Sequence, residues 1–377
     1  MHKIGADREQ AEFLLSLVPL PDGSRNAPRI SEWHVVSSIA RQHGLLPQIF
    51  CRLPEWEGAM PEDHVRLIRE EGYRNAARNC VLAAELLRRL AAFNRAGIPA
   101  LPFKGAALAA QLYGDLAHRP AGDIDILIHF ADLHRAAAVM KEAGYILHPS
   151  DPDAQEFQFT RESDGIVVEL RWRLSPSWFR RDFGMNALWP HRRTSMLLGT
   201  AIPSLSPEHT LILLCLHGTK HEWTRLFWVC DVVQLLSLHR DMDWSLIERD
   251  ARRFGLWGSV ALGVLLSHRL GGVDVEETIL RRFKRSTRVL RLERHIREHL
   301  FDARYRPLDG LPNQHPVLGF RDRIRSLLKA GVAAPNLRDR EFIHLPRKIS
   351  FLYYLVRPLR LTWDHVVVKR AIQREAR

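Results

Sequence analysis

The sequence contains few cysteines and no long apolar run. The four cysteines lie far apart among apolar neighbours and form no Cys-x-x-Cys pair, which argues against a zinc ribbon or a disulfide framework. We therefore expect reduced core thiols in a cytoplasmic protein. No apolar stretch approaches the roughly 18–20 residues that a transmembrane helix needs, and the first residues show no apolar signal core, so neither membrane spanning nor secretion is expected. The cysteines are Cys51, Cys80, Cys215 and Cys230.

The composition is that of a globular protein with unevenly distributed charge. Among the 377 residues, 46% are hydrophobic and 26% are charged, and the length predicts two or three folded domains. The formal net charge is +12, and residues 281–377 carry 24 Lys and Arg against 9 Asp and Glu. We interpret the basic tail as helices with a solvated arginine face. The alternatives are peripheral contact with an anionic membrane and binding of nucleic acid.

Apolar residues at helical spacing predict an all-helical N-terminal region. Residues 31–53 predict two short helices interrupted at Gly44. Proline and acidic residues at 61–63 mark the start of one long helix over residues 62–96, which Gly97 ends.

The pattern then changes to alternating strands and helices. A short apolar run followed by Lys104, Gly105 and an alanine-rich stretch is typical of strand, glycine turn and helix. Two later extended segments, joined by Glu-Ser-Asp-Gly, predict an antiparallel hairpin. The predicted strands are 98–103, 123–129, 145–148, 156–161 and 166–172, and the predicted helices are 106–113 and 131–143. These elements predict a compact unit with a mixed sheet.

From Pro207 onward the sequence is helical again. The predicted helices are 207–221, 225–239, 244–254, 257–270, 276–300 and 317–331. The expected division is a helical region at 1–97, an α/β core at 98–200, a helical domain at 201–335 and a basic tail at 336–377. The fold class is therefore α+β.

One of three Asp-x-Asp triplets opens a predicted strand. Asp123 and Asp125 are two residues apart, so their side chains project from one face of the strand, about 7 Å apart. Two carboxylates so placed repel each other unless a cation lies between them, and Mg²⁺ prefers such oxygen ligands. The alternative is that one aspartate caps or pairs with Arg119 while the other is solvated.

Two nearby features favour a phosphate and metal site. Gly105 follows a strand and opens a helix, so its backbone N–H groups and the helix dipole favour a phosphate, and Lys104 adds a cation. Glu169 lies within an apolar strand, where a carboxylate needs a partner or a metal. For Glu169 the alternative is a salt bridge to Arg171 or Arg173. For Arg119, contact with phosphate and a structural ion pair are equally open.

A second group of polar residues lies on the predicted helix 207–221. His217 and His221 share one helical face, but no glutamate or third ligand completes a zinc site. We expect them, with Lys220 and Arg225, to line the same site and to contact phosphate. The alternative is a packed helix with satisfied histidines. Trp223 and Trp228 are expected in the core.

Three stretches of the sequence resemble a known family. Leu101–Leu108 contains Lys104-Gly105, Arg119–Ile128 contains the Asp-Ile-Asp triplet, and Leu216–Asp231 resembles the family's helical His-Gly, Lys-His and Trp-x-Arg-Leu segment. These motifs resemble the polymerase-β-like nucleotidyltransferases, and more narrowly the bacterial "uncharacterised nucleotidyltransferase" family, a relative of the aminoglycoside and lincosamide nucleotidyltransferases.

The resemblance implies a polymerase-β-like core with a mixed sheet, flanked by helices. It implies that Asp123 and Asp125 bind Mg²⁺, with two ions expected, and that Glu169 is the third carboxylate and activates the acceptor hydroxyl. Lys104-Gly105-Ala106 stands where the superfamily usually has Gly-Ser. Arg171 stands where histidine is common. The expected nucleotide-binding residues are Lys104, Gly105, Ala106, Arg119, His217, Lys220, His221 and Arg225.

The predicted function follows from this resemblance and these residues. We predict a Mg²⁺-dependent enzyme that transfers a nucleoside monophosphate from a nucleoside triphosphate to a hydroxyl group of a small molecule, a sugar or a modified peptide. Two alternatives remain. One is a catalytically inactive nucleotide-binding regulatory protein of the same fold, and the other is an RNA-directed transferase that uses the basic tail.

Overall fold

The computed structural model describes residues 7–18, 30, 32–148, 155–175, 183–302 and 343. Contacts divide the chain into two units, Met1–Asp309 and Gly310–Arg377, and every helix and strand below belongs to the first. The predicted helix at 317–331 and, apart from residue 343, the predicted tail at 336–377 lie outside the described residues. No helix in the described ranges is both long enough and apolar enough to cross a membrane.

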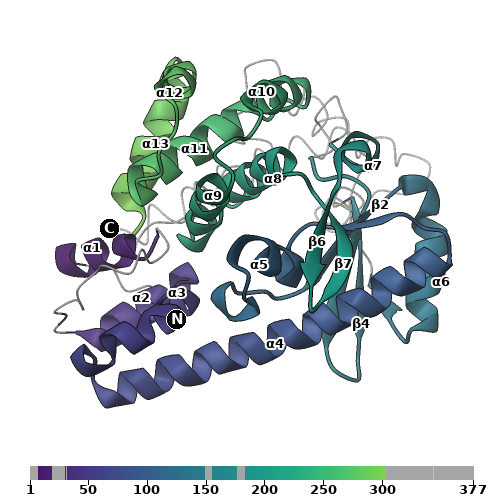
Figure 1. The fold of residues 1–377 in the computed structure, drawn as a ribbon, viewed down its shortest axis with the longest axis horizontal. Coiled ribbons are helices and arrows are strands. Elements are labelled where there is room, and N and C mark those ends of the chain that lie inside the picture. Colours follow the sequence, from purple (N-terminus) through teal and green to yellow (C-terminus); the bar gives the residue numbers. More distant parts are fainter. Residues whose placement is uncertain are drawn as a thin grey trace. The chain divides into compact units, whose positions relative to one another are not determined.

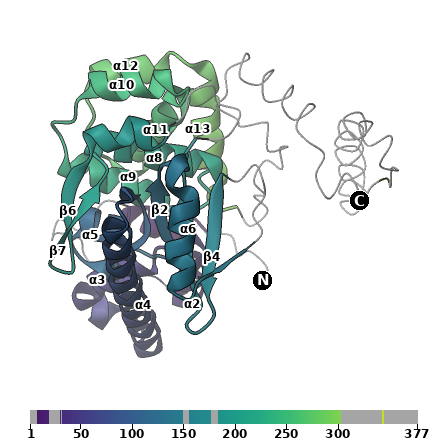
Figure 2. The same ribbon diagram turned by 90° about the vertical axis from the view of Figure 1, so that its right-hand side faces the viewer.

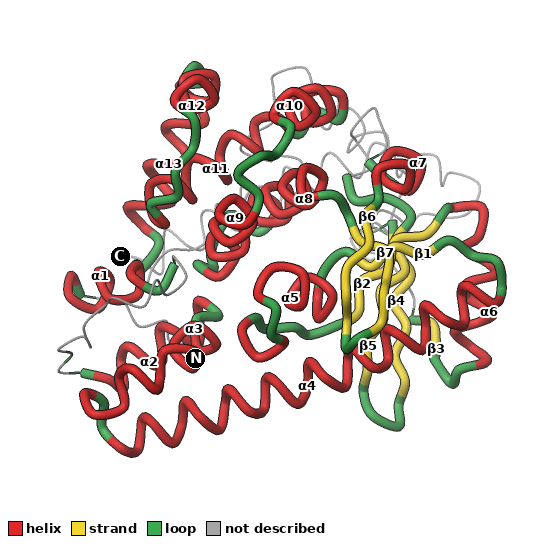
Figure 3. The backbone as a smooth tube through the Cα atoms, in the orientation of Figure 1, coloured by secondary structure: helices red, strands yellow, loops and turns green. Residues whose placement is uncertain are grey.

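A five-stranded mixed sheet confirms the predicted α+β class (Figure 3). Its strand order is β1-β2-β5-β4-β3, with β2 and β5 parallel and the remaining neighbours antiparallel. The strands are β1 (Ala100–Pro102), β2 (Ile124–Ile128), β3 (Ile146–Leu147), β4 (Glu156–Arg161) and β5 (Ile166–Arg171). All five predicted strands are present, and the predicted hairpin forms β4 and β5.

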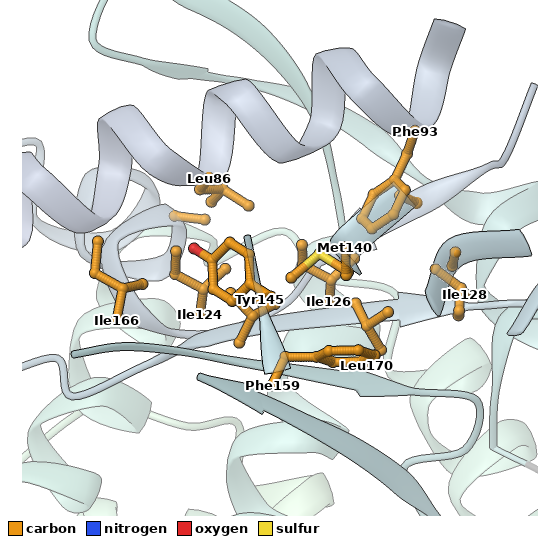
Figure 4. Packing of buried hydrophobic residues seen from close by; sticks show 14 of the residues in the cluster. Leu86, Phe93, Ile124, Ile126, Ile128, Met140, Tyr145, Phe159, Ile166 and Leu170 are labelled. Atoms are coloured by element: carbon orange, nitrogen blue, oxygen red, sulfur yellow. The ribbon is translucent and has the colours of Figure 1, made fainter. Parts of the chain in front are cut away.

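One face of this sheet is apolar and packs against two helices, α4 (Glu62–Arg95) and α6 (Leu133–Glu142) (Figure 4). Every second residue of β2 and of β5 projects to this face, and all of these residues are apolar. Figures 1 and 2 show α4 and α6 beside each other over the sheet, and the two helices are in contact. The core cluster contains Leu86, Phe93, Ile124, Ile126, Ile128, Met140, Tyr145, Phe159, Ile166 and Leu170. The polar residues of β2 and β5 therefore face the other way.

A buried carboxylate ties the hairpin to the long helix α4. Glu85 is fully buried and accepts hydrogen bonds from Arg161, at 3.0 Å, and from the hydroxyl of Tyr145, at 3.1 Å. Burial alone would raise the pKa of Glu85, but Arg161 and Arg89 outweigh it and the pKa is lowered. The charged carboxylate is thus stabilised inside the fold.

Among the described residues, three short α-helices precede α4. They are α1 (Arg8–Ser16), α2 (Trp33–His43) and α3 (Leu46–Trp56), of which α1 was not predicted. Gly44 ends α2 with φ of +70°, in the left-handed region that favours glycine, which confirms the predicted interruption. The prediction for residues 62–96 is also confirmed, since α4 covers 34 residues.

In the part of the chain that the structure describes, six α-helices lie after residue 206: α8 (Pro207–Lys220), α9 (Phe227–Leu238), α10 (Trp244–Arg253), α11 (Trp257–Gly271), α12 (Glu277–Lys284) and α13 (Thr287–His299). The prediction of a single helix at 276–300 is wrong. Ser286 interrupts it, because its side chain accepts a hydrogen bond from the backbone N–H of Val289 and begins a new helix.

A small hairpin and one short helix were not predicted. Strands β6 (Arg193–Leu197) and β7 (Thr200–Ser204) pair through a turn at Leu198 and Gly199, both with positive φ. Two positive φ values give a turn that matches the twist of the strands. The hairpin contacts β1 and helix α5 (Gly105–Tyr113), whereas helix α7 (Met185–Leu188) precedes it.

Candidate functional site

The three predicted carboxylates share the polar face of β2 and β5. Asp125 is paired with Glu169 in the parallel register of the two strands, and Asp123 immediately precedes β2. Because the side-chain period of a strand is two residues, Asp123 and Asp125 project from the same face. The structure thus brings together all three acids that the sequence analysis singled out.

The negative charges of the three acids act on one another. The pKa of Asp123 is raised to about 6, first by burial and then by the negative charges of Asp125 and Glu169. The cations of Lys104 and Arg171 oppose the rise. Three carboxylates of low exposure therefore need positive charge nearby.

Arg171 supplies much of that positive charge. Its Nη2 donates to Glu169 Oε2 at 2.6 Å and its Nε lies 3.6 Å from Asp125 Oδ1. Nη2 is also in direct ionic contact with Glu156, the residue of β4 paired with Arg171 in the antiparallel register. Burial lowers the pKa of Arg171, but its carboxylate neighbours outweigh that effect and raise it. The salt bridge between Glu169 and Arg171, one of the two interpretations of Glu169, is confirmed.

The donor set fits a hard divalent cation. Carboxylate oxygens are the ligands that Mg²⁺ prefers, and Asp123, Asp125 and Glu169 lie close enough to repel one another. In the described residues, however, no group of three or more His, Cys, Asp or Glu side chains is arranged to hold a metal ion directly. The cation between Asp125 and Glu169 in this structure is the guanidinium of Arg171.

The glycine turn brings the start of α5 to Asp123. Gly105 has φ of +57°, and a Cβ at this position would lie 2.8 Å from the carbonyl oxygen of Asp123. Only glycine fits on both counts. The next residue, Ala106, is buried in the first turn of α5. Lys104 precedes the helix, and its Nζ lies 4.0 Å from Asp125 Oδ1. The turn, its cation and the aspartates are therefore adjacent.

The end of α8 adds histidines and cations to this region. The rings of His217 and His221 are 4.6 Å apart, and both contact the ring of Trp228. Removal from water lowers the pKa of His217 well below its usual value, and Lys104 lowers it further. Desolvation and the charge of Lys220 lower the pKa of His221 to about 4. Both imidazoles are thus neutral at pH 7.

These charges interact with the sheet residues as well as with each other. The pKa of Lys220 is lowered, first by desolvation and then by the positive charges of Arg171 and Lys104, whereas Glu156 and Glu169 oppose the change. Arg225 is exposed and lowers the pKa of His221. The expected nucleotide-binding residues of α8 therefore lie near the carboxylates of the sheet.

A buried tryptophan fixes the end of α8. The backbone N–H of Trp223 donates to Gly218 O at 2.8 Å and that of Glu222 donates to Thr219 O at 3.2 Å, the two bonds of a Schellman motif. Glu222 and Trp223 both have φ of +53°. A Cβ on Gly218 would lie 2.6 Å from the ring of Trp223. The prediction that Trp223 belongs to the core is confirmed.

Arg119 lies in a buried ion pair. Its Nε and Nη2 donate to the carboxylate of Asp231 at 3.0–3.1 Å, and Tyr113 donates its hydroxyl to the same carboxylate at 3.0 Å. Its Nη1 lies 3.5 Å from the carbonyl oxygen of Gly105. The structural interpretation of Arg119 is therefore confirmed, and its expected contact with the nucleotide stays a prediction. The pair joins the segment before β2 to α9.

Sequence analysis missed the roles of two acids, Asp231 and Glu156. Asp231 stands among Phe, Trp, Val and Cys in α9 and is fully buried. An aspartate within such an apolar run needs a cationic partner, and this pattern could have been recognised in the sequence. Glu156 opens β4, and its pairing with Arg171 depends on a register that no local pattern sets.

A second group has the connectivity of a catalytic triad without access for a substrate. Ser206 Oγ lies 3.2 Å from His209 Nδ1, and His209 Nε2 lies 3.0 Å from Asp250 Oδ2. All three side chains are buried, and Ser206 accepts a hydrogen bond from the backbone N–H of His209 as the N-cap of α8. We therefore assign this group to helix capping and packing.

Comparison with known proteins supplies a family match. The model of the uncharacterised nucleotidyltransferase family matches residues 30–272, which is more than half of the chain. No curated protein gives a significant match. A solved structure of an antigenic nucleotidyltransferase-like protein from Paracoccidioides brasiliensis is similar at 16% identity, covering 48% of this chain and 91% of that one, with a TM-score of 0.29.

Proposed function

Since the chain belongs to the family of uncharacterised nucleotidyltransferases, we propose that it transfers a nucleoside monophosphate from a nucleoside triphosphate to a hydroxyl group. The acceptor that we propose is a small molecule, a sugar or a modified peptide. The family that the sequence resembles is a relative of the aminoglycoside and lincosamide nucleotidyltransferases, and that relationship favours this class.

The observation that supports the proposal is the juxtaposition of acids and a glycine turn. Asp125 and Glu169 are register partners, Asp123 is beside them, and Gly105 packs directly on the backbone of Asp123. Nucleotidyl transfer needs an anion site for the triphosphate next to carboxylates that hold a cation. The glycine turn and the three carboxylates are the residues that we assign to these two parts.

The three carboxylates have distinct parts in the proposed reaction. Asp123, Asp125 and Glu169 would hold Mg²⁺, which when bound stabilises charge on the attacking and leaving oxygens of the transfer. Glu169 would also accept the proton of the acceptor hydroxyl, as the resemblance implies. A base must lie within hydrogen-bond reach of that proton, and Glu169 first has to be released from Arg171.

The cations around the acids would bind the phosphates. The first N–H groups of α5, at Gly105 and Ala106, and the positive end of the helix dipole favour an anion. Lys104, Lys220 and Arg225 contribute charge from two separate segments of the chain. Their mutual repulsion, which contributes to the lowered pKa of Lys220, would be relieved by a triphosphate.

A labelling experiment tests the proposal. The protein is incubated with each α-labelled nucleoside triphosphate, Mg²⁺ and fractions of small metabolites, and label transfer is measured. Asp123→Asn is expected to abolish transfer without unfolding the protein, because it removes one carboxylate of the metal set. The matched control is Asp243→Asn, in another Asp-x-Asp triplet, where asparagine preserves the N-cap of α10. Retained transfer in Asp123→Asn would refute the assignment.

One observation favours a second candidate function, a nucleotide-binding protein without catalysis. The guanidinium of Arg171 neutralises Asp125 and Glu169, which reduces their need for a metal. Calorimetric binding of a nucleoside triphosphate, together with no release of pyrophosphate on any acceptor, is the result that would support this candidate over the enzyme.

A further inference from the structure

Arg171 contacts two of the acids that would hold the metal, Asp125 and Glu169. Its Nη2 contacts Glu169 Oε2 at 2.6 Å and its Nε lies 3.6 Å from Asp125 Oδ1. These two acids face each other across parallel strands, so a guanidinium that reaches both lies between them. A guanidinium on these oxygens weakens the binding of a divalent cation there, because the two positive groups repel each other and compete for lone pairs of the same carboxylates.

The charge balance of the group explains why the arginine is held there. Four carboxylates of low exposure, those of Asp123, Asp125, Glu156 and Glu169, interact with one another. Arg171 is the cation that contacts three of them directly. A buried carboxylate without a partner is costly, so the arginine stabilises the sheet when no metal is bound.

Glu156 gives the arginine a second partner on the neighbouring strand. It is the register partner of Arg171 in the pairing of β4 with β5, and the two side chains are in direct ionic contact. Asp125 and Glu169 lie on the neighbouring strands β2 and β5, whereas Glu156 lies on β4, which is not a neighbour of β2. An arginine released by the first two acids therefore keeps one ion pair.

We propose that Arg171 is an internal counter-cation that competes with the divalent metal for Asp125 and Glu169, and that Glu156 retains it when the metal enters. This inference rests on the proposed function, because it concerns the metal site of that reaction. Arg171 is then a positioning residue that sets metal affinity. The site discriminates against a bare divalent ion, which has to displace an existing partner.

Binding of Mn²⁺ without nucleotide, followed by electron paramagnetic resonance of the free ion, tests this competition. Arg171→Gln is expected to bind Mn²⁺ about tenfold more tightly than the wild type, because charge-assisted hydrogen bonds no longer have to be broken. Arg171→Lys keeps the charge but not the planar guanidinium that reaches several carboxylates. Its affinity for Mn²⁺ is expected to lie between those of the wild type and Arg171→Gln. The matched control is Arg173→Gln, which removes an arginine whose Nε donates to Ser175, and is expected to resemble the wild type.

A double-mutant cycle tests the part of Glu156. Glu156→Gln weakens Mn²⁺ binding in the wild type both by removing a negative charge and by leaving Arg171 without its alternative partner. In the Arg171→Gln background only the charge effect remains, so the loss is expected to be at least threefold smaller there. Equal losses in the two backgrounds would refute the role of Glu156.

The outcomes separate this inference from the proposed function. Unchanged affinity in Arg171→Gln, an equal gain in Arg173→Gln, or no Mn²⁺ binding even in Arg171→Gln would each overturn the competition. Label transfer by the wild type together with any of these results leaves the proposed function standing. The expected order of affinities without label transfer on any acceptor supports the competition and counts against the enzyme.

Discussion

Loss of the charge on Asp231 is expected to destabilise the fold strongly. Asp231 is fully buried and accepts hydrogen bonds from Arg119, at 3.0–3.1 Å, and from Tyr113, at 3.0 Å. Asp231→Asn keeps the volume of the side chain but leaves the guanidinium of Arg119 buried without its counter-charge. Asp231 raises the pKa of Arg119 against the effect of burial. The guanidinium stays charged when the carboxylate is removed, because the ordinary pKa of arginine lies far above neutral pH.

The expected magnitude follows from the burial of both partners. Removing one partner of a buried ion pair costs about 3–5 kcal/mol, because the remaining charge is not solvated. Asparagine can still accept one hydrogen bond, so we expect the lower end, about 3 kcal/mol. The change in the free energy of unfolding is measured by urea unfolding, followed by tryptophan fluorescence and by circular dichroism. If the two transitions coincide, unfolding is two-state and the free energies of the variants can be compared.

Two controls make the result decisive. Asp243→Asn, at the exposed N-cap of α10, is expected to change the free energy of unfolding by less than about 0.5 kcal/mol. The double variant Arg119→Met with Asp231→Leu removes both charges and is expected to be more stable than Asp231→Asn. A loss below about 1 kcal/mol in Asp231→Asn would refute the reasoning, because it would mean that the pair is solvated.

Three further predictions follow from the packing. Burial lowers the pKa of His209, so the unfolded chain binds a proton at this histidine more tightly than the folded chain does. The contribution of neutral His209 to the free energy of unfolding is complete above pH of about 6.5. It is expected to fall toward pH of about 5, as measured by urea unfolding at a series of pH values. Gly105→Ala is expected to lose nucleotide binding in calorimetry and more than about 1 kcal/mol of stability, because its Cβ would lie 2.8 Å from Asp123 O. Gly218→Ala is expected to cost about 1–3 kcal/mol by thermal unfolding, since its Cβ would meet the ring of Trp223.

Matched variants check each of these. Gly114→Ala also places alanine at a positive φ, but nothing lies within 4 Å of its Cβ, so it isolates backbone strain from the clash at Gly105. Nucleotide binding that is lost equally in both variants would contradict the role of Gly105. His209→Gln is expected to reduce the pH dependence by the share of one histidine, because His217 and His221 also have lowered pKa values and contribute to it. An unchanged slope would contradict the assignment. A fully stable Gly218→Ala would show that the ring can move.

Local signals predicted most of the elements around the site. The alternation of Asp123 to Ile128, the glycine at 105 and the stop at Gly97 each act within a few residues, and the structure has the corresponding strand, turn and helix end. The hairpin of β6 and β7 was missed because Leu198 adopts a positive φ, which is uncommon for a leucine. The break at Ser286 was missed because a strong apolar period runs across it.

The residues of the site could be predicted from the sequence, but the ion pairs that connect them could not. The acids follow from spacing and chemistry, whereas their partners depend on contacts between distant segments. Arg119 and Asp231 are 112 residues apart in the chain, and neither segment alone indicates the other. The contact of Arg171 with Glu156 depends on the register of a hairpin, and a slip of one residue would move either side chain to the other face.

The same register explains why the polar face can exist before any ligand binds. Ile124, Ile126, Val168 and Leu170 are buried on the apolar face, and their burial fixes which residues project on the other side. The acids are therefore brought together by hydrophobic packing, which is insensitive to their charge. Their repulsion is then offset by cations from other segments, with Arg171 the one that contacts three of them. Packing sets the geometry and the arginine offsets the repulsion between the acids, so we expect this site to fold without a metal.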